Sequence, residues 1–385
     1  MLTRDVAVVG VGYSPPVRHG GPDIDTMTRT AALGALADAG LQPADVDAVV
    51  EYSFGMRGDS PIAVGAQRLL GIPDLAMFND IMGTGPSGLA GAMDAAMAIA
   101  SGAAEVALVY RTITREAGHT GAVQEGPAAA RGQAAFTAPY GYAGGIMMAI
   151  GMKMRRRMHE LGTTQEHYGL VALNARRWAR DNERALLRQE ITMDDYLASR
   201  PIAEPLLLFD CDYPVSGSVA AVLTTRERAL DLAKKPVLVE ALAYGTGRDP
   251  DWVFADDLIF GGTLAAGERL WSRTSLTPAD VHVAELYDGF THIAMSWIEA
   301  LGFCGVGEFG DWVDGGKTIG PGGSLPLNTH GGQLTEGRLH GLAFLTEAVL
   351  QLRGECGARQ VPGAAVAVVA NAHGPQAGCM LLRTE

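Results

Sequence analysis

Short apolar runs that suit β-strands alternate along this chain with stretches whose apolar residues recur at helical intervals. The run Asp5 to Gly12 ends in glycines, and Thr26 to Gly40 follows with helical spacing and a glycine stop. Four later runs also predict strands: Ala104 to Tyr110, Val215 to Thr225, Pro236 to Gly247 and Ala364 to Ala370. Strands that alternate with helices predict an α/β fold.

One part of this pattern occurs twice. Leu41 to Tyr52 reads LQPADVDAVVEY and Leu276 to Tyr287 reads LTPADVHVAELY, so the same turn enters a strand at two points of the chain. Pro-Ala-Asp is ordinary turn chemistry, but a glycine-rich turn and a helix also recur, in Met82 to Gly102 and in His330 to Gly354. Two similar halves are the simplest account, with a boundary near Lys235.

A stretch between the two sets of strands, about residues 112–206, lacks the strand pattern. It carries helical spacing over Gly144 to Leu161 and Thr164 to Asn182. We predict a helical loop-domain insertion over one edge of the N-terminal half, residues 1–235, followed by a C-terminal half, residues 236–385. The first repeated helix consists largely of small residues, which predicts very close packing between two sheets. The predicted architecture is a duplicated five-layer α-β-α-β-α arrangement.

Composition and charge limit the class of protein. The chain has 385 residues, of which 48% are hydrophobic and 50 are glycine, enough for two cores or one large layered core. A formal net charge of −13 disfavours binding to nucleic acid or to an anionic membrane surface. The chain opens without a signal-peptide pattern, and no apolar stretch reaches about 18 residues. We therefore expect a cytoplasmic protein that binds neither nucleic acid nor a membrane.

Neither a metal site nor a dinucleotide site is expected. The four cysteines lack the paired spacing of a zinc site or a disulfide framework: Cys211, Cys304, Cys356 and Cys379. Gly10 and Gly12 resemble the start of a dinucleotide-binding loop, but Tyr13-Ser14-Pro15-Pro16 follows where a helix with a third glycine is needed. The sequence therefore predicts reduced cysteines and no bound metal or nucleotide cofactor.

The segment Ala284 to His292, AELYDGFTH, holds the candidate chemistry. An alternating strand pattern ends there in Tyr287 and Asp288, and a flexible glycine and a helix follow. α/β enzymes place reactive side chains at such strand ends. A tyrosine whose hydroxyl only caps a neighbouring carbonyl would give the same pattern, so the segment alone fits both interpretations.

Short motifs accompany this segment. They are Gly85-Pro86-Ser87-Gly88 at the first repeated helix, Tyr287-Asp288-Gly289-Phe290, Asn328-Thr329-His330-Gly331-Gly332, Gly337-Arg338-Leu339-His340-Gly341, and Asn371-Ala372-His373 after the last apolar run. Together with the duplicated halves, these motifs make the chain resemble the thiolase superfamily over nearly its whole length. Within that superfamily it resembles the sterol-carrier-protein or lipid-transfer-type thiolase-like proteins, which include the steroid side-chain-degrading aldolases.

The chain departs from the thiolase pattern at the residues that carry acyl transfer. The family has a nucleophilic cysteine in Cys-Ala-Ser-Gly, a histidine in Gly-His-Pro-x-Gly and a second cysteine in Cys-x-Gly. At these three positions this chain has Gly85, Arg338 and Asn371, respectively. A covalent thioester needs a thiolate, and Ser87 is better explained as a helix cap. The sequence therefore argues against acyltransferase activity. An acyltransferase with an atypical site is kept as an alternative.

The retained scaffold can still stabilise an enolate. Backbone N–H groups near Gly85 and Asn371 would face a thioester oxygen. Retro-aldol cleavage of a β-hydroxyacyl-CoA then needs a base and an acid but no covalent intermediate. Tyr287 is the main candidate, with its phenolate favoured by Arg338, which cannot itself exchange a proton. The resemblance to the steroid aldolases implies a second tyrosine at the position of Arg338.

Three histidines are candidate proton partners of this tyrosine. His373 stands beside the lost second cysteine, His330 lies in the glycine turn, and His340 lies one motif later. Each also has a structural interpretation: His373 as a filler of the space left by the cysteines, His330 as a brace of the glycine turn, and His340 as a packed core residue. We expect Asp288 to stay ionised and to orient a neighbour. The residues assigned to oxyanion stabilisation or substrate binding are Gly85, Asn371, Asp288, His340 and Gly332.

The run MKMRRRMHE, Met152 to Glu160, places three consecutive arginines in the insertion. A solvated helix face is the first interpretation. In the alternative, favoured by the resemblance, Arg155 and Arg156 hold CoA phosphates. The nearby Met147 and Met148 either line an apolar acyl tunnel or pack in the core.

The sequence thus predicts a thiolase-like aldolase, a carbon–carbon lyase that cleaves a β-hydroxyacyl-CoA with a bulky acyl chain, for which a steroid side chain is one candidate. CoA is part of the substrate, so no further cofactor is expected. A non-catalytic acyl-CoA or sterol-binding protein of the lipid-transfer type is the alternative from another class. The resemblance further implies a homodimer and a partner with an OB-fold and a zinc ribbon, which would give a heterotetramer.

Overall fold

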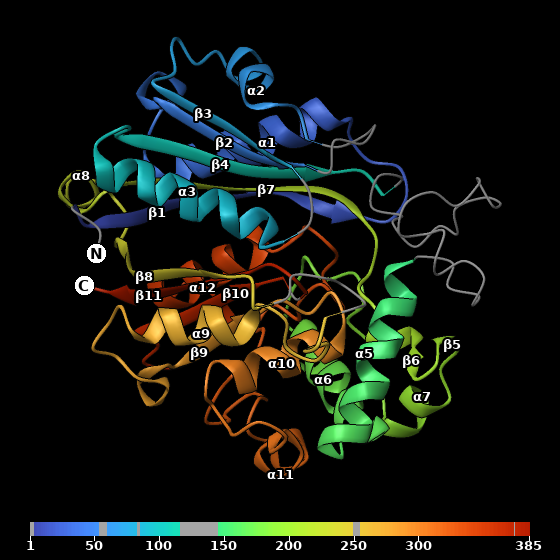
Figure 1. Ribbon diagram of the computed structural model, residues 1–385. Helices are drawn as coiled ribbons and strands as arrows, with labels where there is room; N and C mark the ends of the chain where they lie inside the picture. Colours follow the sequence, from blue (N-terminus) through green and yellow to red (C-terminus); the bar gives the residue numbers. More distant parts are fainter. Residues whose placement is uncertain (1–3, 54–59, 83–84, 116–144, 249–254, 373) are drawn as a thin grey trace.

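The computed structural model describes residues 4–53, 60–82, 85–115, 145–248, 255–372 and 374–385 (Figure 1). Residues 116–144 of the predicted insertion lie outside this part of the chain. His373, one of the three candidate histidines, also lies outside the described residues.

Nine strands of the described residues join in one mixed sheet, in the order β3-β2-β4-β7-β1-β8-β11-β10-β9. Their bounds are β1 Val6–Val17, β2 Ala48–Ser53, β3 Met77–Met82, β4 Val106–Ile113, β7 Ser216–Thr225, β8 Val237–Gly245, β9 Val283–Leu286, β10 Val366–Asn371 and β11 Ala377–Thr384. The strands of the two predicted halves meet where β1 pairs with β8, through Ala7 with Leu238 and Val8 with Val237. The predicted boundary near Lys235 falls just before β8, and the division into domains stays a prediction.

The two parts of the sheet face each other across two helices, α3 (Ser87–Ser101) and α12 (Leu342–Arg353), which share one core with both (Figure 1). The outer faces are covered by α1 (Ile24–Ala39) and α2 (Ala63–Leu70) on one side, and by α9 (Thr263–Trp271) and α10 (Thr291–Ala300) on the other. The five-layer α-β-α-β-α fold is therefore confirmed.

Small residues in α3 permit the close packing of this central layer. A Cβ atom on Gly91 would lie 2.9 Å from Cγ1 of Val109 in β4. One on Gly88 would lie 2.9 Å from the carbonyl oxygen of His340, just before α12. Distances this short exclude a side chain at either position without a shift of the neighbour.

The repeated turn has the same conformation in both halves. Pro43–Asp45 and Pro278–Asp280 each form one 3₁₀ turn, and the residues before them have φ/ψ of −119°/161° at Gln42 and −125°/167° at Thr277. In each copy the aspartate accepts a hydrogen bond from the backbone N–H of that preceding residue, over 2.8 Å. Each turn leads into a strand, so Tyr52 and Tyr287 occupy equivalent strand ends.

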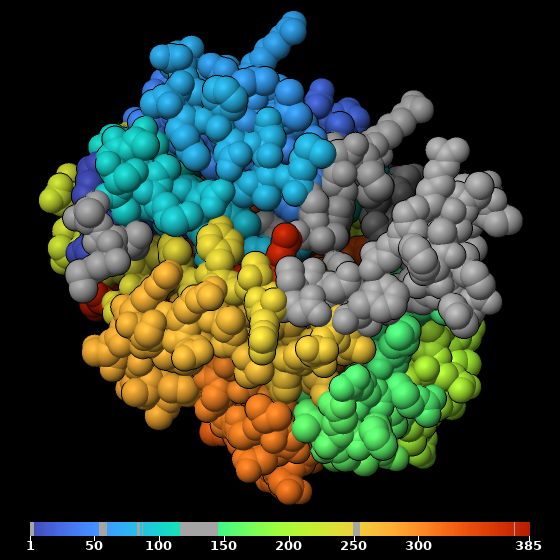
Figure 2. All heavy atoms as spheres, viewed as in Figure 1, coloured from blue at the N-terminus to red at the C-terminus, as the bar shows by residue number. Residues whose placement is uncertain are grey.

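The described part of the helical insertion packs against the C-terminal half, whereas we had predicted that the insertion lies over an edge of the N-terminal half. Its elements are α5 Ile146–Leu161, α6 Gln165–Ala179, α7 Met193–Leu197, β5 Pro201–Ala203 and β6 Leu206–Leu207. Apolar residues of α5 and α6, among them Met154 and Tyr168, share a core with α10 and with the outer face of the second part of the sheet. Figure 2 shows α5, in green, beside the yellow and orange surface of the C-terminal half. The physical reason is that α10 carries an apolar face, with Ile293 and Trp297 buried, that α6 covers.

Candidate active site

Tyr287 is held at the end of β9 by the Asn328 motif. The side chain of Asn328 accepts a hydrogen bond from the N–H of Leu286 over 2.7 Å and donates one to its carbonyl oxygen over 2.8 Å. The N–H of Tyr287 itself donates to the carbonyl of Ala370 in the parallel strand β10, over 2.9 Å. The backbone before the tyrosine side chain is thus fixed from both sides.

The phenol ring of Tyr287 leans over its own turn. A Cβ atom on Gly289 would lie 3.0 Å from the phenol oxygen, so the glycine gives the ring room. The ring also contacts Phe344 of α12, with 6.1 Å between centroids. The Gln333 side chain lies near the hydroxyl and lowers the phenol pKa. Within the described residues this hydroxyl makes no hydrogen bond to a carbonyl, which disfavours the capping interpretation.

Arg338 lies beside this phenol and has a counter-ion of its own. Its side chain is 7% exposed, and Nη1 lies 3.5 Å from Oδ1 of Asp212. Burial raises the pKa of Tyr287 well above its ordinary value, Asp212 raises it further, and Arg338 opposes both. The expectation that Arg338 would favour the phenolate is therefore correct in direction, but burial outweighs it. Tyr287 is a neutral phenol at pH 7.

Asp212 was not predicted from the sequence. Burial raises the pKa of this carboxyl group to about 6, although Arg338 acts to lower it. Its backbone N–H donates to the carbonyl of Gly289 over 3.1 Å, so it lies against the Tyr287 turn. The only sequence signal was its position in Asp210-Cys211-Asp212, directly before the strand β7. At pH 7 most Asp212 side chains are ionised, so this carboxylate can accept a proton.

Gln333 is a second residue that the sequence did not single out. Its N–H donates to Oδ1 of Asp288 over 2.8 Å, and its Oε1 accepts from the backbone N–H of His340 over 2.9 Å. These contacts connect two of the predicted site residues, Asp288 and His340, and the Gln333 side chain also lowers the pKa of the Tyr287 phenol. Its position directly after the Gly331-Gly332 turn was the available signal.

Asp288 is fully buried, and its carboxylate occupies the space that a side chain at position 332 would need. A Cβ atom on Gly332 would lie 1.8 Å from Oδ2 of Asp288, and Gly332 has φ +65°. The glycine is therefore required for the close approach of the Asp288 carboxylate. Burial raises the pKa of Asp288 to about 7 despite hydrogen bonds from Gln333 and Asn328. We had expected Asp288 to stay ionised; with this pKa, about half of the Asp288 side chains are protonated at pH 7, because burial opposes those donors.

His340 is a neutral imidazole between two guanidinium groups. Burial, Arg111 and Arg338 place its pKa well below the ordinary value. Nε of Arg111 donates to Nδ1 of His340 over 3.3 Å. Since Nδ1 accepts, the remaining ring proton is on Nε2. His340 can donate a hydrogen bond from Nε2 but cannot act as an imidazolium acid near neutral pH.

His330 belongs to a buried ionic network behind the site. Its Nδ1 lies 2.9 Å from Oε2 of Glu285, and its ring packs on Phe344 at 5.0 Å. Burial alone would lower the pKa of His330, but Glu285 and two further glutamates raise it to about 9. The network continues through Thr329, which hydrogen-bonds with both Glu285 and Glu347. These contacts favour the bracing interpretation over proton transfer.

Asn371 connects the start of α3 to the loop before α12. Its Nδ2 donates to the carbonyls of Pro86, over 2.7 Å, and of His340, over 3.3 Å, and its Oδ1 accepts from Ala372. The side chain of Asn371 thus positions the helix start. A Cβ atom on Gly85, at φ +131°, would lie 2.5 Å from Oε1 of Gln376, so that amide lies where a side chain at position 85 would project.

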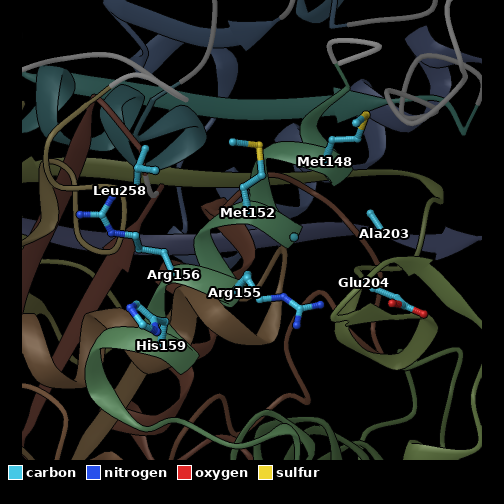
Figure 3. A pocket seen from close by; sticks show the side chains of 9 residues that line it. Met148, Met152, Arg155, Arg156, His159, Ala203, Glu204 and Leu258 are labelled. Carbon is cyan, nitrogen blue, oxygen red and sulfur yellow. The ribbon is translucent and has the colours of Figure 1, made fainter. Parts of the chain in front are cut away.

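The first two arginines of the insertion line a cavity of about 680 Å³ (Figure 3). Figure 3 shows Arg155, Arg156 and His159 projecting from α5, with Met148 and Met152 on the same helix. Met147 lies elsewhere, against the core shared with the C-terminal half. The third arginine differs from our expectation of a solvated face: Arg157 is fully buried in an ion pair with Glu299.

The described residues hold no group of three or more His, Cys, Asp or Glu side chains arranged to bind a metal ion. The four cysteines are free thiols. In the part of the chain that the structure describes, no helix has both the length and the apolar character needed to cross a membrane.

Comparison with known proteins identifies the family. The family model "Thiolase C-terminal domain-like" matches residues 250–380. The chain is 38% identical over 366 residues to "17-hydroxy-3-oxo-4-pregnene-20-carboxyl-CoA lyase" of Mycobacterium tuberculosis, covering 92% of this chain and 93% of the relative. It is 35% identical to "Steroid side-chain-cleaving aldolase" of Thermomonospora curvata, covering 92% of each.

Among solved structures, the chain is similar to "Ltp2-ChsH2(DUF35) aldolase", with a TM-score of 0.89 and 32% identity over 100% of this chain and 99% of that chain. The resemblance inferred from the motifs is therefore confirmed. The chain belongs to the thiolase superfamily, among the lipid-transfer-type thiolase-like proteins close to the steroid side-chain-cleaving aldolases.

Proposed function

We propose that this protein is a carbon–carbon lyase that cleaves a β-hydroxyacyl-CoA by a retro-aldol reaction, with a steroid side-chain thioester as the substrate. The names of its relatives support this activity. The observation that carries it is the arrangement of Tyr287, Arg338 and Asp212 at a site where Gly85 replaces a nucleophile. Such a site can move protons but offers no covalent acyl carrier.

In this mechanism Asp212 takes the proton of the β-hydroxyl group, the bond between the α and β carbons breaks, and its electron pair passes into an enolate of the thioester. Donors at the start of α3 and the Nε2–H of His340 stabilise the enolate oxygen. Tyr287, neutral at pH 7, then protonates the α carbon. The products are a ketone and a shortened acyl-CoA. Arg338 balances the charge as the proton leaves Tyr287.

The cavity along α5 is the proposed site of the CoA phosphates. Arg155 and Arg156 contribute two guanidinium groups and His159 a third donor, although Arg156 also pairs with Glu160 on the same helix. Met148 and Met152 give the inner wall an apolar surface that suits a pantetheine arm or an acyl chain.

We also propose a cytoplasmic homodimer. The strand β3 is an edge of the sheet, and it exposes large apolar side chains: Phe78 is 59% exposed and Met82 is 69% exposed. An exposed apolar edge strand favours pairing with another strand. The name of one similar solved structure joins an aldolase to a DUF35 protein. By analogy, a partner with an OB-fold and zinc ribbon would complete a heterotetramer.

The test is product analysis. The chain, alone and with an OB-fold/zinc-ribbon partner, is incubated with steroid and non-steroid β-hydroxyacyl-CoA thioesters, and products are identified by mass spectrometry. A ketone and a shortened acyl-CoA are expected from the steroid thioesters. Intact substrate throughout, with tight binding retained, would contradict the lyase and support the acyl-CoA or sterol-binding alternative.

A further inference from the structure

A second cavity, of about 460 Å³, is lined in part by Asp212. Tyr213 and Asp212 contribute to its wall beside the end of β1 and the helix α6. Four arginines from four separate parts of the chain line it: Arg18, Arg115, Arg176 and Arg200. A protein of net charge −13 thus concentrates positive charge next to its candidate active site.

These guanidinium groups have no carboxylate partners among the described residues. None of the four forms an ion pair there, and the one carboxylate of the wall, Asp212, pairs with Arg338. Glu190 and Asp195 face a neighbouring hollow that shares Arg176 and Arg200, without ion-pair contact to either. Uncompensated positive charge in a cavity favours an anionic ligand.

Two of the arginines pack against aromatic rings. Arg176 is only 9% exposed, and its guanidinium carbon lies 5.3 Å from the ring centroid of Phe209. Its Nη1 donates to the carbonyl of Gln189 over 3.1 Å, and burial lowers its pKa. Arg18 lies 4.9 Å from the ring centroid of Tyr213. A buried guanidinium that packs on a ring and is held by a backbone hydrogen bond is prepared for bidentate contact with a carboxylate or a phosphate.

We propose that this cavity binds an anionic oxygen group, a carboxylate or a phosphate, of the substrate. The identification with the substrate rests on the proposed function, because Asp212 belongs to both the cavity wall and the reaction centre. A carboxylate would be carried by the acyl chain, whereas a phosphate would belong to CoA, and the α5 cavity would then not be the site of that phosphate. In the first case the enzyme selects an acyl chain that ends in an acid.

Equilibrium binding separates these sources without any need for turnover. Succinyl-CoA, butanoyl-CoA and dephospho-CoA are titrated by calorimetry against the full chain and the variants Arg176→Gln and Arg200→Gln. The control is Arg29→Gln, which removes the same charge from the exposed face of α1. Arg200 is exposed, so its variant keeps the test valid if the buried Arg176 is needed for folding.

If the cavity binds an acyl carboxylate, wild type binds succinyl-CoA about tenfold more tightly than butanoyl-CoA, and either variant removes that preference. If it binds a CoA phosphate, both thioesters weaken about tenfold together in the variants. Equal affinities in wild type, both variants and Arg29→Gln would overturn the proposal. Because binding is the readout, a lack of carbon–carbon cleavage would count only against the proposed function.

Discussion

Nη1 of Arg338 lies 3.5 Å from Oδ1 of Asp212, so the cation that stands in place of the family's histidine is shared between a carboxylate and the phenol of Tyr287. A buried cation that faces two acidic groups lowers the pKa of both. Removing its charge should therefore change the pH dependence of the reaction as well as its rate.

For Arg338→Gln we expect the acidic limb of the kcat/KM profile to move upward. Asp212 has a pKa of about 6 with Arg338 present, and losing the cation raises it, so more of the base is protonated at a given pH. The rate at pH 7 should fall about tenfold or more. Arg338→Lys keeps the charge and should leave the limb near 6. If the acidic limb of the Arg338→Gln profile stays in place, Asp212 is not the catalytic base.

Tyr287→Phe should abolish cleavage while the protein still binds acyl-CoA. Loss of a general acid typically costs about 10²–10⁴-fold in rate, and the phenyl ring keeps the contact with Phe344. Steady-state kinetics and calorimetric binding measure the two effects separately. Tyr244→Phe, which removes a hydroxyl bonded to Asp94, is the matched control with normal turnover expected. Unchanged turnover in Tyr287→Phe would exclude the tyrosine from catalysis.

Gly85→Cys should not restore acyl transfer. The new side chain would meet Gln376, because a Cβ atom there lies 2.5 Å from Oε1. A cysteine also needs a base to form its thiolate, and the family's histidine is Arg338 in this chain. Intact-protein mass spectrometry after incubation with acyl-CoA should show no adduct. An added acyl mass would mean that the ancestral chemistry needs only the thiol.

Gly332→Ala should destabilise the fold by about 2–4 kcal/mol, because the methyl group meets the Asp288 carboxylate and φ is in the left-handed region. Denaturant unfolding provides the measurement. Gly363 has φ +72°, and a Cβ atom there would have no other atom within 4 Å. Gly363→Ala should cost only about 1–2 kcal/mol of backbone strain. Equal losses would mean that the Asp288 contact adds nothing.

The ion pair of His330 and Glu285 should make stability depend on pH. The pKa of His330 is about 9 against an ordinary 6.5, so the folded state binds the proton more tightly. Its contribution, roughly 3 kcal/mol, is fully present below pH 6.5 and is lost as pH rises through 9. His330→Gln should be less stable than wild type at pH 6, with the difference narrowing by pH 10. The exposed His282→Gln provides the control, and a constant difference would contradict the assignment.

The sequence predicted those features that depend on local pattern. The Pro-Ala-Asp turns, the buried small-residue helix and the position of Tyr287 all follow from neighbours in the chain. Asp212 and Gln333 could not be found in this way, because their roles come from contacts with residues far away in sequence. The hydrogen bond from the backbone N–H of Gln333 to Asp288, for example, joins positions 45 residues apart. The raised pKa of Asp288 could not be predicted for a related reason, since the packing of whole layers determines how deeply a side chain is buried.

The repeated turn has a consequence for how the two halves diverged. It delivers a tyrosine to the same strand end in each half, Tyr52 and Tyr287. The ring of Tyr52 lies 5.0 Å from the guanidinium carbon of Arg111 and makes an edge contact with His340 at 6.0 Å. One copy thus packs beside Arg111 and His340, while the other carries the phenol that we propose as the proton donor. The same turn therefore delivers one tyrosine with a packing role and one with a proposed chemical role.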